Sequence, residues 1–345
     1  MTAESSWGLP TTGRIVAITM GEPSGIGGEL TIKSWLRRSD VSLPFVAIDN
    51  AERLAIIADN LSTDIPIKIV SSPSEALNVF GTALPVIDLP LAVLSQPGEL
   101  RTDNAPAVIA SIETAVSLIQ SGEISGVVTN PIHKNNLYGA GFKYPGHTEF
   151  LADLAGSEVE PVMMLACDGL RTVPITTHLS LRDAIRSLSV DRIISQSRIT
   201  ADALRLDFGL HAPRLAIAGL NPHASEDGSM GNEEQSIIRP AIEALQAAGM
   251  NVSGPYPPDT LFSAAMRTTY DVAICMYHDQ ALIPIKTLDF SGGVNVTLGL
   301  PFVRTSPDHG TALDIAGKGT ADETSMIAAL RMAADITRER VTTAA

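Results

Sequence analysis

Titratable residues gather in one stretch of the chain, between residues 271 and 319. The apolar run Val272–Met276 is followed at once by His278 and Asp279. A buried strand that ends in ionisable residues is how open α/β sheets place chemistry at strand carboxyl ends. Further polar residues follow between short apolar pieces: Lys286, Asn295, Arg304, Asp308 and His309. A core strand with a solvated loop behind it is the alternative, but a core gains nothing from so many ionisable groups.

Histidine recurs just after apolar runs. Four such histidines occur: His133, His178, His223 and His278. The loops around the last three are alike: Thr177-His178-Leu179, Pro222-His223-Ala224 and Tyr277-His278-Asp279. Neighbouring parallel strands present these loops on one edge of a sheet, so three imidazoles could converge on one divalent ion and leave room for substrate. No HxxxH or CxxC spacing supports this, and capping or hydrogen-bonded loop histidines stay an open alternative.

An anion site is indicated by the segment Pro145-Gly146-His147-Thr148-Glu149, which precedes a short predicted helix. Free N–H groups at a helix start suit an anion, although simple N-capping by Thr148 explains the segment equally well. Lys286 and Arg304 would favour a phosphate if they face the same cleft. The glycine-rich turn Gly21–Gly28 is neither GxGxxG nor a Walker loop, and a tight strand-to-helix turn explains it as well.

The elements that must position these residues alternate along the chain. Strands are predicted at Arg14–Met20, Phe45–Ile48, Ile67–Val70, Leu84–Ile87, Gly126–Val128, Met163–Ala166, Thr172–Thr176, Leu215–Ala218 and Val272–Met276. Helices are predicted at Leu30–Arg37, Ala51–Asn60, Asn104–Ile119 (with Asn104 as cap), Glu149–Leu154, Asp191–Leu206, Glu233–Ala248 and Glu323–Arg338. This alternation predicts α/β architecture with mostly parallel sheet covered by helices.

Composition narrows the class of protein. The 345 residues predict two domains or one large α/β unit. No apolar run approaches the ~20 residues that span a bilayer, and the N-terminus lacks a signal peptide pattern. The net charge of −14 argues against a nucleic-acid partner. Cys167 and Cys275 form no metal-binding spacing, which favours buried thiols in a reducing, cytoplasmic compartment.

Long motifs give the chain a resemblance to a known family. In order they are ITMGEPSGIGGE, NPIHKNNLYGAGFKYPGHTEFLA, THLSL, GLNPHA, GPYPPDTLF, YHDQALIPIK, GVNVTLGLPFVRTSPDHGTA and DIAGKG. From about Ile15 to Ala328 the chain resembles the 4-hydroxythreonine-4-phosphate dehydrogenase family of pyridoxal phosphate biosynthesis. HGTALDIAGKG also resembles the nucleotide-binding stretch of isopropylmalate and isocitrate dehydrogenases. The resemblance implies two α/β/α domains flanking a cleft, not a classical Rossmann fold, which we expect at residues 1–135 with 310–345 and at 136–309.

The resemblance also implies roles for individual residues. The implied metal ligands are His178, His223 and His278, for one zinc, magnesium or cobalt ion. The implied substrate-binding residues are His147, Thr148, Lys286, Asn295 and Arg304. The nicotinamide cofactor, NAD or NADP, is expected around residues 304–316, at Asp308, His309, Gly310 and Asp314, and the acidity there favours NAD. Lys286 and Asp259 are alternative proton acceptors. A homodimer with the active site at the subunit interface is the expected assembly.

The reaction implied by the resemblance is oxidation of 4-phosphohydroxy-L-threonine to 2-amino-3-oxo-4-phosphooxybutanoate. This β-keto acid then loses carbon dioxide to give 3-amino-2-oxopropyl phosphate. The chain departs from the usual family residues at Glu22, Ser24, Gly28 and Ser225. The departures leave open oxidation of D-erythronate or D-threonate 4-phosphate, as in a side branch of the family. A non-catalytic anion- or nucleotide-binding protein on the same scaffold is the third alternative.

Overall fold

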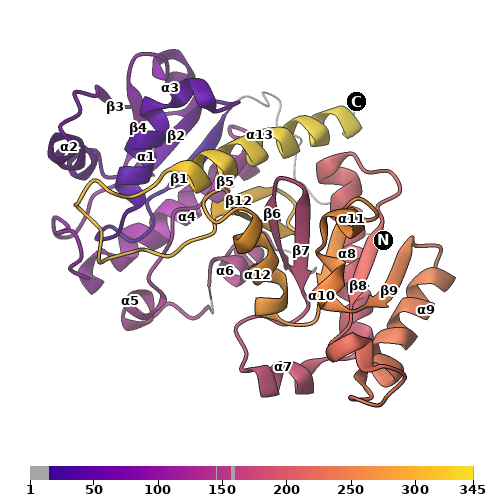
Figure 1. Cartoon of the computed structure of the whole chain (residues 1–345). Helices are drawn as coiled ribbons and strands as arrows, with labels where there is room; N and C mark the ends of the chain where they lie inside the picture. The colour runs from indigo at the N-terminus through magenta and orange to yellow at the C-terminus, as the bar shows by residue number, and fades with distance from the viewer. Residues whose placement is uncertain (1–14, 145, 157–159, 345) are drawn as a thin grey trace. The chain divides into compact units, whose positions relative to one another are not determined.

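The computed structural model describes residues 15–144, 146–156 and 160–344, and its contacts divide the chain into two compact units (Figure 1). The first unit comprises the chain up to Pro161 together with Leu300–Ala345, and the second comprises Val162–Gly299. We predicted boundaries after residues 135 and 309 instead. The difference arises because α6 (His147–Leu154) packs on α4 (Ala105–Gln120), and β12 (Val303–Pro307) pairs with β5 (Gly126–Val128).

The first unit contains a parallel sheet of strands in the order β3-β4-β2-β1-β5-β12. Besides β5 and β12, its strands are β1 (Val16–Thr19), β2 (Phe45–Asp49), β3 (Ile67–Ile69) and β4 (Leu84–Asp88). Every residue of β1 and β2 is buried, so both faces of the sheet centre are covered. All these strands therefore end at one edge of the unit, where their loops lie together.

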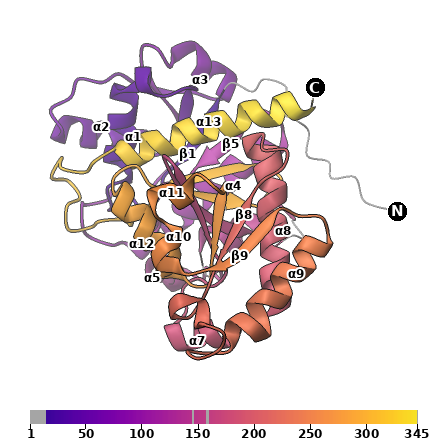
Figure 2. The ribbon, with the colours of Figure 1, turned by 45° about the vertical axis from the view of Figure 1, so that its right-hand side comes forward.

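Helices cover the sheet of the first unit. Besides α4 and α6 they are α1 (Gly27–Leu36), α2 (Ala51–Asn60), α3 (Pro73–Val79), α5 (Lys134–Gly139) and α13 (Thr324–Ala344), with short 3-10 turns at Arg38–Asp40 and Thr102–Asn104. The long helix α13 lies along β12, β5 and β1 (Figure 2). Helix α4 packs on β1, β2 and β5. Asn104 stands at its N-cap position, but its amide hydrogen-bonds the backbone of Val93, so the predicted side-chain cap is wrong.

The second unit contains a mixed sheet in the order β11-β6-β7-β10-β8-β9. Its strands are β6 (Val162–Cys167), β7 (Leu170–Pro174), β8 (Leu215–Ala218), β9 (Val252–Tyr256), β10 (Val272–Cys275) and β11 (Val294–Leu298). β6 is antiparallel to β7 and β11, while β7, β10, β8 and β9 run parallel. A two-residue Asp168-Gly169 turn, with Gly169 at φ 74°, joins β6 to β7 as tight hairpins require.

Helices of the second unit are α7 (Leu181–Ser187), α8 (Val190–Phe208), α9 (Arg239–Ala247), α10 (Pro258–Leu261), α11 (Ala264–Arg267) and α12 (His278–Leu288). A 3-10 turn lies at Pro222–Ser225 and a π-helical turn at Glu234–Ile238. Helix α12 packs on β7, β6 and β10, and α8 packs on α9. The predicted α/β class is confirmed. Within the described part of the chain, no helix is long and apolar enough to cross a membrane.

Candidate active site

The three related histidine loops follow three adjacent parallel strands of the second unit. His178 follows β7, His278 follows β10 and His223 follows β8, and the sheet order is β7-β10-β8. The predicted adjacency of these strand ends is therefore confirmed. His133 differs from them, because it caps α5 by accepting a hydrogen bond from the Asn136 backbone N–H at 3.3 Å.

His178 and His278 lie close to each other. Their ring centroids are 5.9 Å apart, and both residues line a pocket of about 230 Å³. The Nδ1 atom of His278 is 2.7 Å from Oδ1 of Asp279. A carboxylate bonded to one imidazole nitrogen fixes the tautomer and leaves the other nitrogen, here Nε2, as the ligand atom. These two imidazoles therefore fit a shared divalent ion.

His223 lies on a loop of unusual backbone. The five residues His223 to Asp227 all have positive φ, between 43° and 69°. His223 is exposed and does not line the pocket of His178 and His278. Over residues 15–144, 146–156 and 160–344, no three His, Cys, Asp or Glu side chains are close enough together to hold a metal ion. The structure thus brings two of the three predicted ligands together.

Glu234 anchors the His223 loop, and the sequence analysis missed it. The carboxylate is fully buried and accepts the backbone N–H groups of Leu220 and Asn221, both at 2.7 Å. It also accepts the side-chain amide of Asn221 at 2.9 Å. The available signal was the Glu233-Glu234 pair that ends the glycine-containing loop. Its role is to hold the end of β8 and the start of the loop in place.

A second cluster, in the first unit, is positively charged. Helix α6 starts at His147 with Gly146 as N-cap and no side-chain cap, so the alternative in which Thr148 caps the helix is wrong. The Nε2 atom of His147 is buried and has no hydrogen-bond partner among the described residues. Burial, with help from Arg304 and Lys134, lowers the pKa of His147 well below its usual value. A neutral imidazole beside two cations at a helix start suits an anion.

Arg304 is the deepest cation of this cluster. It is 4 % exposed, and its Nη2 donates to Thr129 Oγ1 at 2.8 Å. Burial lowers the pKa of Arg304 to about 10, against the opposing effect of Glu149, so the guanidinium stays charged at neutral pH. Lys134, which the sequence analysis did not single out, follows β5 in the motif Asn130-Pro131-Ile132-His133-Lys134. Its Nζ would lie 3.4 Å from a Cβ at Gly146.

Lys286, Asn295 and Asp259 belong to the second unit. Lys286 is in the last turn of α12, with Nζ 5.4 Å from the ring centroid of Phe290. Asn295 is a half-buried residue of β11. Asp259 is the second residue of α10 and lines a pocket of about 330 Å³ along α12. That pocket shares Asp279 and Tyr277 with the histidine pocket, so Asp259 is near the start of α12.

The predicted cofactor residues Asp308, His309, Gly310 and Asp314 follow β12 in the first unit. This segment packs on the glycine-rich turn, since Ile26 N–H donates to Thr311 O at 3.1 Å. A Cβ at Gly25 would lie 2.8 Å from the same oxygen. Close packing therefore explains this glycine, which favours the tight-turn interpretation of residues 21–28.

Comparison with known proteins shows the family. The model of the family "Pyridoxal phosphate biosynthetic protein PdxA" matches residues 41–333. The chain is 51% identical over 329 residues to 4-hydroxythreonine-4-phosphate dehydrogenase of Bradyrhizobium diazoefficiens, covering 92% of this chain and 95% of that protein. It is 50% identical over 334 residues to the enzyme of the same name from Caulobacter vibrioides, covering 95% and 99%.

A solved structure of an enzyme with the same name is also similar to this chain. The 4-hydroxythreonine-4-phosphate dehydrogenase of Klebsiella pneumoniae matches with a TM-score of 0.85 and 39% identity, over 94% of this chain and 98% of that one. At this coverage the match extends over both units. The chain therefore belongs to the PdxA family of pyridoxal phosphate biosynthetic proteins.

Proposed function

We propose that this chain is a metal- and NAD-dependent dehydrogenase that oxidises 4-phosphohydroxy-L-threonine, with decarboxylation of the β-keto acid product. Relatives that carry the name 4-hydroxythreonine-4-phosphate dehydrogenase are about half identical over nearly their whole length. The observation that carries the proposal is the pairing of His178 and His278, 5.9 Å apart at the ends of adjacent strands. Two imidazoles at the ends of adjacent strands supply nitrogen ligands of the kind that a catalytic divalent ion uses.

The proposed metal ligands are His178, His223 and His278. When bound, a zinc, cobalt or magnesium ion would act as a Lewis acid on the substrate hydroxyl, and NAD would take up the hydride. Asp279 orients the His278 ring, so that Nε2 is its ligand atom. Glu234 restrains the loop that carries His223. Nitrogen ligands suit zinc and cobalt better than magnesium.

The proposed anion-binding residues are His147, Thr148 and Arg304, with Lys286 and Asn295 binding the same substrate. Arg304 supports this role because it is buried yet still charged at neutral pH. A guanidinium in a dry site binds phosphate or carboxylate more strongly than one in water. Lys286 and Asp259 stay the two candidates for taking the alcohol proton. Asp259 is favoured by its place in the pocket that reaches Asp279.

We propose NAD as the cofactor, bound by Asp308, His309, Gly310 and Asp314. Carboxylates in this segment would repel the additional phosphate of NADP. Cys167 and Cys275 are free thiols, which supports a location in the reducing cytoplasm.

A homodimer is proposed as the working assembly, with the active site at the interface. Large apolar side chains on and just after α12 support it: Ile283 is 63 % exposed and Phe290 77 % exposed. Exposed apolar side chains grouped in this way mark surfaces that a partner covers. Sedimentation of the purified chain at micromolar concentration should give twice the mass of one chain, whereas a stable monomer would contradict the proposal.

Turnover of defined substrates tests the function. NADH formation is followed with 4-phosphohydroxy-L-threonine, D-erythronate 4-phosphate and D-threonate 4-phosphate, each with and without a chelator. We expect the first substrate to give the highest kcat/KM and the chelator to abolish it. A preference for a sugar-acid phosphate would assign the chain to the alternative branch of the family. Absence of NADH with all three would indicate the non-catalytic alternative.

Variants of the two proposed phosphate-binding cations sharpen this test. Arg304→Ala and Lys286→Ala should each lower kcat/KM about 30-fold or more, because truncating one partner of a desolvated ion pair costs roughly 2–5 kcal/mol. Lys143→Ala, at an exposed lysine of the first unit, is the matched control. It should change kcat/KM by less than about fivefold. Unchanged kcat/KM in both test variants would place phosphate binding elsewhere.

A further inference from the structure

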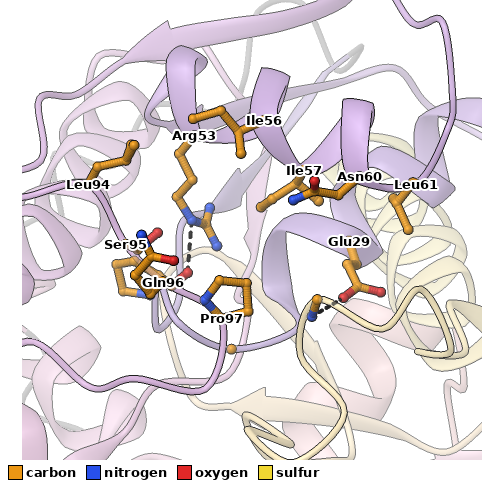
Figure 3. A pocket seen from close by; sticks show the side chains of 13 residues that line it. Glu29, Arg53, Ile56, Ile57, Asn60, Leu61, Leu94, Ser95, Gln96 and Pro97 are labelled. Atoms are coloured by element: carbon orange, nitrogen blue, oxygen red, sulfur yellow. Dashed lines mark hydrogen bonds between the residues drawn. The ribbon is translucent and has the colours of Figure 1, made fainter.

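Buried polar side chains hold loops at strand carboxyl ends in both units. In the first unit, Arg53 Nε donates to Pro23 O at 3.0 Å, and Glu29 Oε1 accepts the Gly317 N–H at 2.7 Å (Figure 3). The pocket beside them has a volume of about 100 Å³, below the roughly 300–1,000 Å³ of small-molecule sites. These bonds fix the glycine-rich turn and the segment after β12. Similar bonds in the second unit hold the loops that carry the three strand-end histidines.

Thr176 links the end of β7 to the end of β10. The side chain is 1 % exposed, and its Oγ1 donates to the backbone carbonyl of Met276 at 2.8 Å. His178 follows Thr176 by two residues, and His278 follows Met276 by two residues. The bond therefore joins the two chain segments just before the two imidazoles whose ring centroids are 5.9 Å apart.

Gln280 links the end of β10 to the end of β8. It lies in the first turn of α12 and is 6 % exposed. Its Oε1 accepts the Met276 N–H at 2.6 Å, and its Nε2 donates to Gly219 O at 2.8 Å. The orientation of the amide follows from these partners, because the N–H requires the oxygen and the carbonyl requires the nitrogen. Gly219 directly follows β8 and precedes the loop that carries His223, which Glu234 anchors.

Met276 is the point at which the two links meet. Its C=O accepts from Thr176, and its N–H donates to Gln280. The paired register of β10 with β8 extends to Ile274 and Ile217, so Gln280 bridges the two strands beyond that register. The two side chains thus connect the carboxyl ends of three adjacent strands through a single backbone position.

We infer that Thr176 and Gln280 are positioning residues that set the mutual spacing of the three histidine loops. The inference rests on the proposed metal site. Imidazole nitrogens bind a divalent ion such as zinc at about 2.0–2.1 Å, so displacement of one strand end weakens binding although every ligand is still present. Neither residue contacts the ion; each acts through the backbone that carries a ligand.

A purely structural role is the alternative, because loss of a buried hydrogen bond lowers stability wherever the bond lies. Thr305 in β12 provides the matched control for this alternative. It is 0 % exposed, and its Oγ1 donates to the backbone carbonyl of Ala329 at 2.8 Å, the same length as the Thr176 bond. Both residues of this pair belong to the first unit, whereas the histidine loops belong to the second.

Titration of the metal-free, full-length protein with cobalt(II) tests the inference. Thr176→Val and Gln280→Leu should each weaken cobalt binding about tenfold or more, as loss of an outer-shell partner does. Thr176→Ser keeps the hydroxyl and should bind cobalt as the wild type does. Thr305→Val should melt at a lower temperature than the wild type, as Thr176→Val does, but bind cobalt with unchanged affinity. Wild-type affinity in Thr176→Val and Gln280→Leu, or an equal loss in Thr305→Val, would overturn the inference.

NMR signals of the histidine rings, recorded without metal, keep this test separate from the proposed function. The ring signals of His178 and His278 should shift in Thr176→Val and stay unchanged in Thr176→Ser, with exposed His211 as the internal reference. In Gln280→Leu the signals of His223 and His278 should shift. A wild type that binds no cobalt would refute the proposed metal site, and the ring signals would then decide the positioning role by themselves. Unshifted ring signals in Thr176→Val and Gln280→Leu would overturn it.

Discussion

Two loops at strand carboxyl ends, one in each unit, both contain residues with positive φ, but the residue types at those positions differ. After β1, the positive φ of 66° falls on Gly21, which has no Cβ to clash. After β8, the positive φ values fall on five consecutive non-glycine residues, from His223 to Asp227. Left-handed backbone costs an L-residue roughly 1–2 kcal/mol. The β1 loop is therefore relaxed, whereas the β8 loop stores strain, as backbone at functional sites often does.

The surroundings of the two loops explain how each conformation persists. The β1 loop is fixed by close packing, since a Cβ at Gly21 would lie 2.6 Å from Asn130 Cβ. The β8 loop is fixed by the buried carboxylate of Glu234 and its three hydrogen bonds. Backbone strain of this kind is often found at functional sites, and we expect it to serve the proposed placement of His223. Substitutions in the two loops should consequently have opposite effects on stability.

The largest expected effect is at Gly21. Gly21→Ala adds a methyl group 2.7 Å from Pro131 O at a positive φ, so overpacking and backbone strain add together. We expect a loss of about 3 kcal/mol or more in the free energy of unfolding, measured in urea. Gly122→Ala is the matched control, because Gly122 has φ 76° but no atom within 4 Å of the place that its new methyl group would take. It should lose about 1 kcal/mol, and equal losses would refute the role of packing.

Removal of the Glu234 carboxylate should cause the next largest loss in the free energy of unfolding. Glu234→Ala leaves the buried N–H groups of Leu220 and Asn221 without an acceptor, and we expect a loss of about 2–4 kcal/mol. Glu233→Ala is the control on the neighbouring residue, which is partly exposed and bonds only the Asn221 side chain and nearby backbone. It should cost about 1 kcal/mol or less. A Glu234→Ala protein as stable as Glu233→Ala would show that the loop needs no anchor.

The charge cluster of the first unit should respond to pH. His147, close to Arg304 and Lys134, has a lowered pKa, so below about pH 6.5 the unfolded chain binds a proton that the folded chain does not. Stability is then lost as pH falls, by up to about 1.4 kcal/mol per pH unit. Unfolding of wild type and His147→Gln is compared at about pH 7.5 and pH 5. A wild type that loses no more stability than the variant would contradict an imidazole that stays neutral in the folded chain.

The smallest expected effect has the opposite sign. Glu226→Gly relieves the strain of a residue at φ 43° on an exposed part of the β8 loop, and should stabilise the fold by about 1 kcal/mol. The same substitution at Glu243, exposed on α9, should destabilise it by about 1 kcal/mol. Melting temperatures of the two variants should therefore move in opposite directions. Movement in the same direction would show that the β8 loop is unstrained.

Sequence analysis predicted the strands that carry the histidines because apolar runs and abrupt polar ends are local signals. It missed β9 (Val252–Tyr256), whose Gly254 and Pro255 are poor strand residues, and it did not predict α12, which contains Pro284. It also missed Glu234 and Lys134. The Glu233-Glu234 pair stands out in the sequence, but which of its members is buried, and which contacts Glu234 and Lys134 make, depends on residues that lie further along the chain. The predicted unit boundaries differed from the observed ones because pairing between strands distant in the sequence determines the unit to which a segment belongs.

Metal binding tests the central claim most directly. Metal-free protein is titrated with cobalt(II) while bound metal is measured by absorbance and dialysis, for wild type, His178→Ala, His223→Ala and His278→Ala, with exposed His211→Ala as control. We expect the wild type and the control to bind one ion per chain. Loss of an outer-shell partner lowers metal affinity by about 10–100-fold. Each variant of the three strand-end histidines removes a ligand itself and should lower the affinity by at least that factor. Unchanged affinity in His223→Ala, or no stoichiometric ion in the wild type, would contradict the three-histidine site.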